Sequence, residues 1–312
     1  MKIPINFKKI LPTVTKYITN DTPVISADER SHQGLIVPEL IKKYGDLNLN
    51  PFKRNSVSIR KVLPILKEMK ISYKSLPKNP NLHKKTIDET TLNNLRDYAR
   101  TMGVEDIKFT EVDPSMIFAG KKILFKRAIV LTYRMEKEIM KLAPSGESND
   151  EVFRTYYELG KIVNRVAGFL RSHGFNAQAG PALGGDVNYP WLAQKAGIGA
   201  VGKHGLLITP NLGPSLRIAA VYTDIENLPV TEMNDHLWIR DFCDSCNKCV
   251  RKCPAGAIYA EIKIFPDNTK QCIDYKKCAV PFSRNHGCSV CIKECLFFSQ
   301  DYFKIKASFE VK

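Results

Sequence analysis

The stretch Cys243-Asp-Ser-Cys246-Asn-Lys-Cys249-Val-Arg-Lys-Cys253-Pro254 decides the fold of the C-terminal part of this 312-residue chain. It contains four cysteines separated by two, two and three residues, and proline follows the last of them. So short a segment brings four thiols to one place only if they share a ligand. The first prediction from the sequence is therefore a bound metal or metal cluster.

This spacing is typical of bacterial ferredoxins, in which three thiolates bind one [4Fe–4S] cluster and the fourth binds a second cluster. Downstream cysteines repeat the steps of two and three residues. We therefore predict two clusters. The expected ligands are Cys243, Cys246, Cys249 and Cys295 for one cluster and Cys253, Cys272, Cys288 and Cys291 for the other, and Cys278 is left over.

Zinc and disulfides explain the cysteines less well. A structural zinc site prefers two Cys-x2-Cys pairs separated by a longer loop. Disulfides need an oxidising compartment, and the chain has nine cysteines, an odd number, all of them after residue 242. A larger body followed by a compact cluster-binding module is the favoured interpretation.

Charge and hydropathy limit the partners and the compartment. Residues 1–100 carry 19 basic against 9 acidic side chains, which is +10 of the formal charge of +15. A basic face suits nucleic acid or an acidic redox partner, but a solvated lysine-rich surface is the favoured interpretation, so nucleic acid is not the favoured partner. No signal peptide or membrane-spanning stretch is recognised, and we expect a cytoplasmic protein without a membrane partner.

Apolar periodicity predicts helices and strands from residue 88 onward, after a basic N-terminal extension, 1–85, that wraps the core. One helical stripe runs from Leu92 to Met102 and ends at Gly103. A capping box formed by Ser148 and Glu151 begins the strongest helix. Strands are expected at 107–109, 128–133, 175–179, 206–209 and 216–223, and an earlier helix near 57–70.

A glycine-rich segment, Gly197-Ile-Gly199-Ala-Val-Gly202-Lys203-His204-Gly205, precedes the last two of these strands. Glycine lets the backbone approach a ligand closely. The spacing matches neither a Walker loop nor a dinucleotide-binding fingerprint, so a phosphate loop is not predicted.

The segment from Lys195 to Pro210, followed by Leu212-Gly-Pro214, Arg217 and Phe242-Cys243, resembles the corrinoid-dependent iron–sulfur reductases, which include epoxyqueuosine reductases and reductive dehalogenases. The similarity extends from about residue 88 to 298. It implies an α/β (α+β) fold. A nitroreductase-like corrinoid-binding core is expected at 86–235, and a ferredoxin-type module with two [4Fe–4S] clusters at 236–312.

The resemblance also implies site residues. Tyr156 matches the proton donor of the dehalogenase branch, Lys203 matches the basic residue that assists it, and Asp186 lies nearest to the acid of the epoxyqueuosine branch. A core tyrosine, a solvated lysine and a turn-forming aspartate are the alternatives. His204 is expected to hydrogen-bond the edge of the corrin. The expected cobalamin-binding residues are Gly199, Gly202, Lys203, His204, Gly205 and Thr209.

The predicted function is an iron–sulfur oxidoreductase that uses cobalamin to cleave a carbon–heteroatom bond reductively. Its partners would be an external low-potential electron donor of the ferredoxin or flavodoxin type and a small-molecule or tRNA-nucleoside substrate. The alternative is a ferredoxin-like electron carrier without corrinoid. After Cys295 the chain continues Leu-Phe-Phe, where epoxyqueuosine reductases place Pro-Trp, so the substrate stays open.

Overall fold

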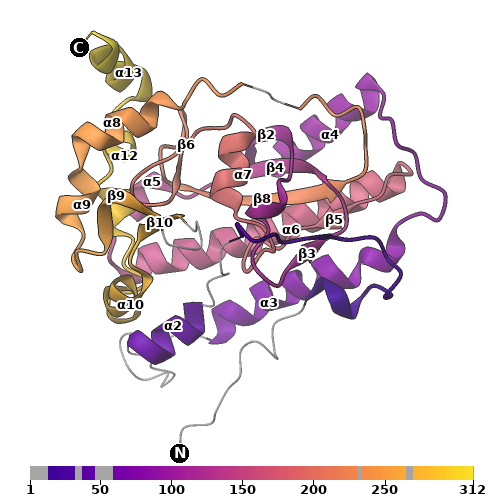
Figure 1. Ribbon diagram of the computed structural model, residues 1–312, viewed down its shortest axis with the longest axis horizontal. Coiled ribbons are helices and arrows are strands. Elements are labelled where there is room, and N and C mark those ends of the chain that lie inside the picture. The colour runs from indigo at the N-terminus through magenta and orange to yellow at the C-terminus, as the bar shows by residue number, and fades with distance from the viewer. Residues whose placement is uncertain (1–12, 32–36, 46–58, 231–232, 265–269, 312) are drawn as a thin grey trace, which may run out of the picture.

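The computed structural model describes residues 13–31, 37–45, 59–230, 233–264 and 270–311 (Figure 1). The helix predicted near 57–70 is α3 (Ile59–Lys74), and the first two residues of that prediction lie outside the described ranges. In the part of the chain that the structure describes, every helix is too short or too polar to span a bilayer.

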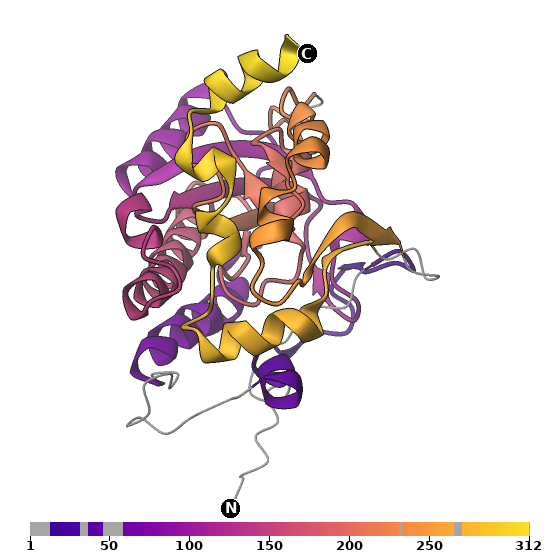
Figure 2. The ribbon, with the colours of Figure 1, turned by 90° about the vertical axis from the view of Figure 1, so that its left-hand side faces the viewer.

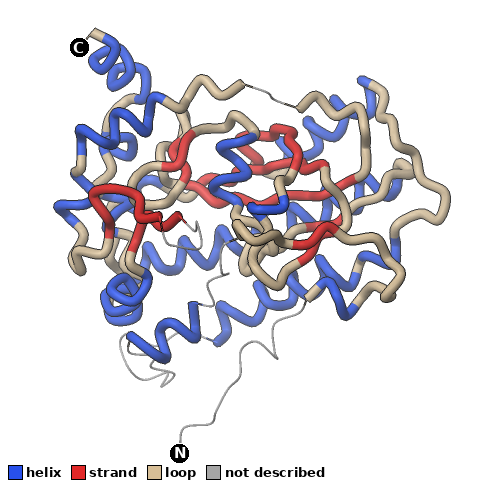
Figure 3. The backbone as a smooth tube through the Cα atoms, in the orientation of Figure 1, coloured by secondary structure: helices blue, strands red, loops and turns tan. Residues whose placement is uncertain are grey.

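A four-stranded antiparallel sheet with the order β2-β4-β8-β5 forms the core (Figure 3). Its central strands pair along their whole length, with Ala128 opposite Tyr222 and Leu131 opposite Ala219. Residues 128–132 and 219–223 are all buried, so both faces of the sheet are covered. The strands are β2 (Val104–Glu111), β4 (Arg127–Arg134), β5 (Gln178–Ala179) and β8 (Leu216–Thr223).

Helices cover the two faces of this sheet. The long helix α6 (Gly146–Ser172) and α4 (Glu89–Thr101) lie on one side, and α7 (Tyr189–Lys195) lies on the other (Figure 2). The buried positions of α6 recur every three or four residues, as an amphipathic helix requires. Completely buried positions include Leu159, Val163, Val166 and Leu170.

The start of α6 differs from the prediction. Ser145, not Ser148, is the N-cap, because its side chain accepts a hydrogen bond from the Ser148 N–H at 3.1 Å and Ser148 Oγ accepts one from the Ser145 N–H. The Glu151 carboxylate accepts hydrogen bonds from the Glu136 N–H and from Arg154 instead. A serine at each candidate position made the capping pattern ambiguous in the sequence.

The N-terminal region packs against both later parts of the chain. Helix α3 lies along α6, and α2 (Val37–Tyr44) lies against α10 (Tyr275–Arg284), as Figures 1 and 2 show. The Lys276 ammonium is 5.6 Å from the centre of the Tyr44 ring. Helices α3 and α2 therefore connect the N-terminal region to the core and to the cysteine-rich module, respectively.

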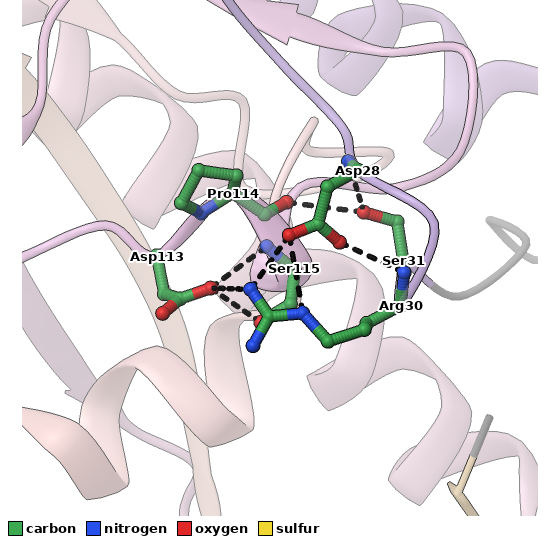
Figure 4. Close-up of polar contacts among 6 residues, drawn as sticks. All are labelled: Asp28, Arg30, Ser31, Asp113, Pro114 and Ser115. Carbon is green, nitrogen blue, oxygen red and sulfur yellow. Dashed lines mark hydrogen bonds and ion pairs between the residues drawn. The ribbon is translucent and has the colours of Figure 1, made fainter. Parts of the chain in front are cut away.

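Arg30 ties the first described segment to the turn that follows β2 (Figure 4). Its guanidinium is 2.7 Å from an Asp28 carboxylate oxygen and 3.3 Å from Asp113. Ser31 Oγ donates a hydrogen bond to the Pro114 carbonyl at 3.1 Å. Because the Arg30 side chain is 57% exposed, these ion pairs position the segment more than they stabilise the fold.

The C-terminal module shares a second hydrophobic cluster with the core. Met135, Ala200 and Ile208 pack there with Ile239 and Phe297. The module is consequently held at one end of the sheet. Its elements are α8 (Trp238–Cys246), α9 (Lys248–Lys252), β9 (Ile258–Ile264), β10 (Lys270–Ile273), α10, α11 (Val290–Lys293), α12 (Leu296–Ser299) and α13 (Tyr302–Glu310).

The predicted fold class is confirmed, since a mixed helix-and-strand core precedes a cysteine-rich module. The strands predicted at 128–133 and 216–223 are β4 and β8, and the first helical stripe is α4 with Asp88 as its N-cap. The remaining short elements are η1 (Val14–Lys16), β1 (Ile25–Ser26), η2 (Leu76–Lys78), η3 (Pro114–Met116), β3 (Lys122–Ile123), α5 (Lys137–Met140), β6 (Ala200–Val201) and β7 (Leu207–Ile208).

Leu170→Ala should destabilise the protein, because the lost side chain leaves a cavity between α6 and the sheet. The expected loss is about 2–5 kcal/mol in the free energy of unfolding. Leu82→Ala is the matched control: this side chain is 95% exposed, and its loss should change the free energy by less than about 0.5 kcal/mol. Urea denaturation followed by circular dichroism measures both, and equal effects would contradict the packing described above.

Candidate functional site

Four cysteines line one pocket at the end of the sheet. Cys243 and Cys246 belong to α8, Cys249 to α9, and Cys295 is the N-cap of α12. Asn247 joins α8 to α9 in the left-handed conformation, with φ of 49°, so the chain turns sharply between the second and third thiols. The other lining residues are His204, Phe242, Asn247, Lys248, Leu296 and Phe297. These four thiols were predicted to bind one cluster.

The surroundings of this first thiol set favour a neutral thiol until a metal binds. Burial raises the pKa of Cys243 to about 12, although the Lys203 backbone N–H acts to lower it. Burial also raises the pKa of Cys295. A coordinated iron removes the proton outright, because its positive charge stabilises the thiolate. The apolar walls therefore suit a cluster more than free ionised cysteines.

A second set of thiols lies next to the first. The pKa of Cys291 is raised by burial and by the charges of Cys288, Cys278, Cys249 and Cys253, which places these sulfurs around it. Cys278 in turn feels the charges of Cys288 and Cys253, and its pKa rises to about 11, mainly through burial. The structure thus gathers Cys253, Cys278, Cys288 and Cys291.

Cys272, the predicted ligand of the second cluster, has other neighbours. This residue is on β10, and its Cβ would be 3.3 Å from a Cβ added to Gly205. Burial raises the pKa of Cys272 and the charge of Arg240 lowers it. Cys278, on α10, is a second candidate for the same place, because the charges of Cys288 and Cys253 act on it. Both thiols precede Cys288 at lengths that a connecting segment can span, so spacing alone did not separate them.

Sulfurs of the two thiol sets act on one another. Cys249 of the first set contributes to the charge felt by Cys291 of the second. Among the described residues, no three His, Cys, Asp or Glu side chains form a group that could hold a single metal ion. Adjacent thiol sets of this kind match the two-cluster ferredoxin spacing of the sequence.

His204 lines the first pocket and is only 3% exposed. Its Nδ1 accepts a hydrogen bond from the Leu206 N–H at 3.2 Å, and Nε2 has no hydrogen-bond partner among the described residues. Burial lowers the pKa of His204 to about 4, so the ring is neutral near pH 7. This ring, predicted from the sequence to lie at the edge of a corrin, shares its pocket with the four cysteines of the first set.

The glycine-rich segment packs against the chain itself. A Cβ on Gly199 would lie 2.0 Å from the Ile208 carbonyl oxygen, so glycine permits β6 and β7 to meet. Gly205 has a φ of +76°. Thr209 accepts a hydrogen bond from the Leu212 N–H. At these predicted corrinoid-binding positions the structure thus shows close contacts within the chain itself.

Lys203 belongs to the first thiol set. Its ammonium donates to Asn247 Oδ1 at 2.8 Å and is 3.2 Å from an Asp244 carboxylate oxygen. Its positive charge lowers the pKa of Cys249, although burial raises that pKa overall. The side chain is 9% exposed, so it is not the solvated loop lysine of the alternative interpretation.

The cation beside Tyr156 is Arg217. The guanidinium carbon lies 4.3 Å from the centre of the half-buried Tyr156 ring, and Arg217 comes from β8, across from α6. Its Nε is buried and has no hydrogen-bond partner among the described residues. Arg217 is thus a further candidate, besides the predicted Lys203, for the cation that assists Tyr156. The position of Arg217 on a central strand did not reveal this contact from the sequence.

Asp186 is 1% exposed and joins the N-terminal region to the core. Its carboxylate accepts a hydrogen bond from the Tyr73 hydroxyl at 2.7 Å, and Lys121 Nζ is 3.2 Å from the other oxygen. Burial raises the pKa of Asp186, against Lys121 and Tyr73, which lower it. The carboxylate is therefore held in a buried polar cluster away from both thiol sets.

Comparison with known proteins agrees with this geometry. The 4Fe-4S binding domain family matches residues 236–259. A tetrachloroethene reductive dehalogenase of Desulfitobacterium hafniense is 32% identical over 209 residues, which cover 62% of this chain and 36% of that protein. An epoxyqueuosine reductase of Listeria monocytogenes is 35% identical over 118 residues, which cover 36% of this chain and 30% of that protein. The chain thus matches about a third of the length of these relatives.

A solved structure of a catabolic reductive dehalogenase in complex with 3-bromo-4-hydroxybenzoic acid has the same fold. It superposes with a TM-score of 0.67 at 19% identity, over 94% of this chain and 45% of that one. The chain is a homologue of reductive dehalogenases and epoxyqueuosine reductases, with a reductive dehalogenase fold and a 4Fe-4S binding domain.

Proposed function

We propose that this protein is an iron–sulfur reductase that cleaves a carbon–halogen bond with electrons delivered by two [4Fe–4S] clusters. The observation that carries the proposal is the pair of adjacent thiol sets at one end of the sheet. We also propose that the chain has three parts: an extension at 1–85, a core at 86–235 and a module at 236–312.

The first cluster would be held by Cys243, Cys246, Cys249 and Cys295, and the second by Cys253, Cys278, Cys288 and Cys291. Replacing a halogen with hydrogen consumes two electrons and one proton and releases a halide ion. Each cluster carries one electron at a time, and two clusters side by side suit stepwise delivery. Asn247 and Asp244 hold the Lys203 ammonium in place. Its positive charge would offset the negative charge of the first cluster.

Tyr156 is the group best placed to supply the proton. A phenol donates reluctantly near neutral pH unless a cation stabilises the phenolate that remains. Arg217 provides that cation, at 4.3 Å from the ring centre. The guanidinium stays charged throughout, so the proton moves from the Tyr156 hydroxyl to the substrate carbon.

A corrinoid is the cofactor proposed for the bond cleavage, in which it would supply a strongly reducing cobalt centre. The support is a solved reductive dehalogenase, described as carrying out B12-dependent dehalogenation, that has the same fold at a TM-score of 0.67. The glycine-rich segment between Gly199 and Thr209 is the proposed place for the corrinoid. An electron carrier without corrinoid is the competing function.

Organohalides are favoured over epoxyqueuosine-modified tRNA as substrates. The dehalogenase relative matches 62% of this chain, whereas the epoxyqueuosine reductase relative matches 36%. The electron donor would be an acidic ferredoxin or flavodoxin, because exposed basic side chains flank the second thiol set on α9 and α10. They are Arg251, Lys252, Lys276 and Lys277.

Anaerobic reconstitution with iron and sulfide should load about eight iron atoms per chain, since each cluster contains four. Cys278→Ala should lower this to about four, because it removes a ligand of the second cluster. Cys272→Ala is the matched control and should retain about eight. Iron analysis with a colorimetric chelator measures all three, and iron loss in Cys272→Ala alone would restore the assignment made from spacing.

Hydroxocobalamin added during reconstitution should bind at about one per chain if the corrinoid proposal is correct. Gel filtration followed by absorption spectroscopy measures the bound corrinoid, and bovine serum albumin passed through the same column corrects for unspecific carry-over. A protein with full iron and no corrinoid would favour the electron carrier.

Tyr156→Phe should slow dehalogenation by about 10²- to 10⁴-fold while leaving both clusters bound, because only the proton donor is lost. Arg217→Gln should slow the same step, and the two losses should be strongly non-additive. Lys203→Gln is the control, whose effect should add to that of Tyr156→Phe. Halide release from a brominated hydroxybenzoate, driven by a reduced low-potential dye, gives the rates. Turnover near the wild-type rate in Tyr156→Phe would remove Tyr156 from the mechanism.

A further inference from the structure

The His204 ring carries a buried donor that the protein itself leaves unpaired. Because Nδ1 accepts the Leu206 N–H, the neutral ring has its proton on Nε2. Nε2 has no hydrogen-bond partner among the described residues, and the residue is 3% exposed. Burying an unpaired N–H is unfavourable, so this site selects for a ligand that accepts a hydrogen bond.

The unpaired edge of the ring lies against the first thiol set. A Cβ built on Gly202 would be 3.2 Å from His204 Cε1, the atom bonded to Nε2, and 3.6 Å from Cys243 Sγ. The ring edge and the sulfur therefore face the same small space above the Gly202 backbone. A side chain at position 202 would enter that space and would also lie 2.7 Å from Ile208 Cδ1, so glycine leaves the space open.

Sulfur is the acceptor that this pocket offers to His204. The walls formed by Phe242, Leu296 and Phe297 are apolar. Asn247 Oδ1 accepts a hydrogen bond from Lys203. The thiolates and sulfides of a cluster bound by the four cysteines would supply the acceptor that the histidine lacks.

We propose that His204 Nε2–H donates a hydrogen bond to sulfur of the first cluster and thereby raises the reduction potential of that cluster. The proposal rests on the function proposed above, because it needs the first cluster to be bound. A reduced cluster carries one more negative charge than an oxidised one, so the donor stabilises the reduced state more. His204 is in this view a positioning and tuning residue for the cluster nearest to the core.

The test is a redox titration of the reconstituted full-length protein, followed by electron paramagnetic resonance. His204→Leu removes the donor, and His204→Asn removes it while keeping an acceptor for the Leu206 N–H. At a fixed potential, the ratio of reduced to oxidised first cluster should be about tenfold lower in both variants. This corresponds to a reduction potential that is about 59 mV lower for a one-electron couple. The reduction potential of the second cluster should not change.

His204→Gln keeps an N–H donor at a similar distance from the backbone. The reduction potential of the first cluster should therefore stay close to the wild-type value in this variant. His173→Leu, at the exposed end of α6, is the matched control and should leave both transitions unchanged. Wild-type potentials in His204→Leu and His204→Asn, with full iron, would overturn the proposal.

Iron content separates this inference from the function on which it rests. If the wild-type protein binds no iron, the proposed function fails and the role of His204 fails with it. Loss of about four iron atoms in His204→Leu and His204→Asn, but not in His204→Gln, would support a donor needed to hold the cluster. Equal iron loss in all three variants would overturn the inference, because ring packing and not the N–H would then be responsible.

Discussion

The structure depends on bringing cysteines from separate segments to two neighbouring points. Four described residues at or near these cysteines adopt the left-handed conformation that side chains disfavour: Asn247, His286, Cys288 and Ser289, with φ between 48° and 60°. Such strain persists only where other interactions compensate for it. Metal–thiolate bonds are the strongest interactions available at these turns, so the geometry of the module and its affinity for metal are linked.

The position of the module relative to the sheet follows from shared burial. Met135 and Ile208 from the core pack with Ile239 and Phe297 from the module in one apolar cluster. Because the interior of such a cluster is packed with few voids, it fixes the position of the module relative to the core. The N-terminal helices add to this, since α3 packs on α6 and α2 packs on α10. The helix that carries Cys278 is thus supported by α2.

Two cations and one carboxylate at the site have separate tasks. Lys203 is held by Asn247 and Asp244 beside the first thiol set, where its charge favours ionised sulfur. Arg217 faces the Tyr156 ring on the sheet. The buried Asp186 carboxylate accepts a hydrogen bond from Tyr73 and lies 3.2 Å from the Lys121 ammonium. In the proposed mechanism, this separation would place negative charge at the clusters and proton donation at the sheet, each with its own stabilising cation.

Local patterns in the sequence determined the elements and the chemistry. The central strands, helices α4 and α6 and the cysteine-rich module were predictable, because apolar periodicity and thiol spacing act over a few neighbouring residues. The residues that complete the site were decided by the tertiary structure. The packing of distant segments decides that the charge of Cys288 acts on Cys278, that Arg217 lies over the Tyr156 ring, and that His204 lines the pocket of the first thiol set. Such contacts arise from burial across the whole chain, which no local spacing encodes.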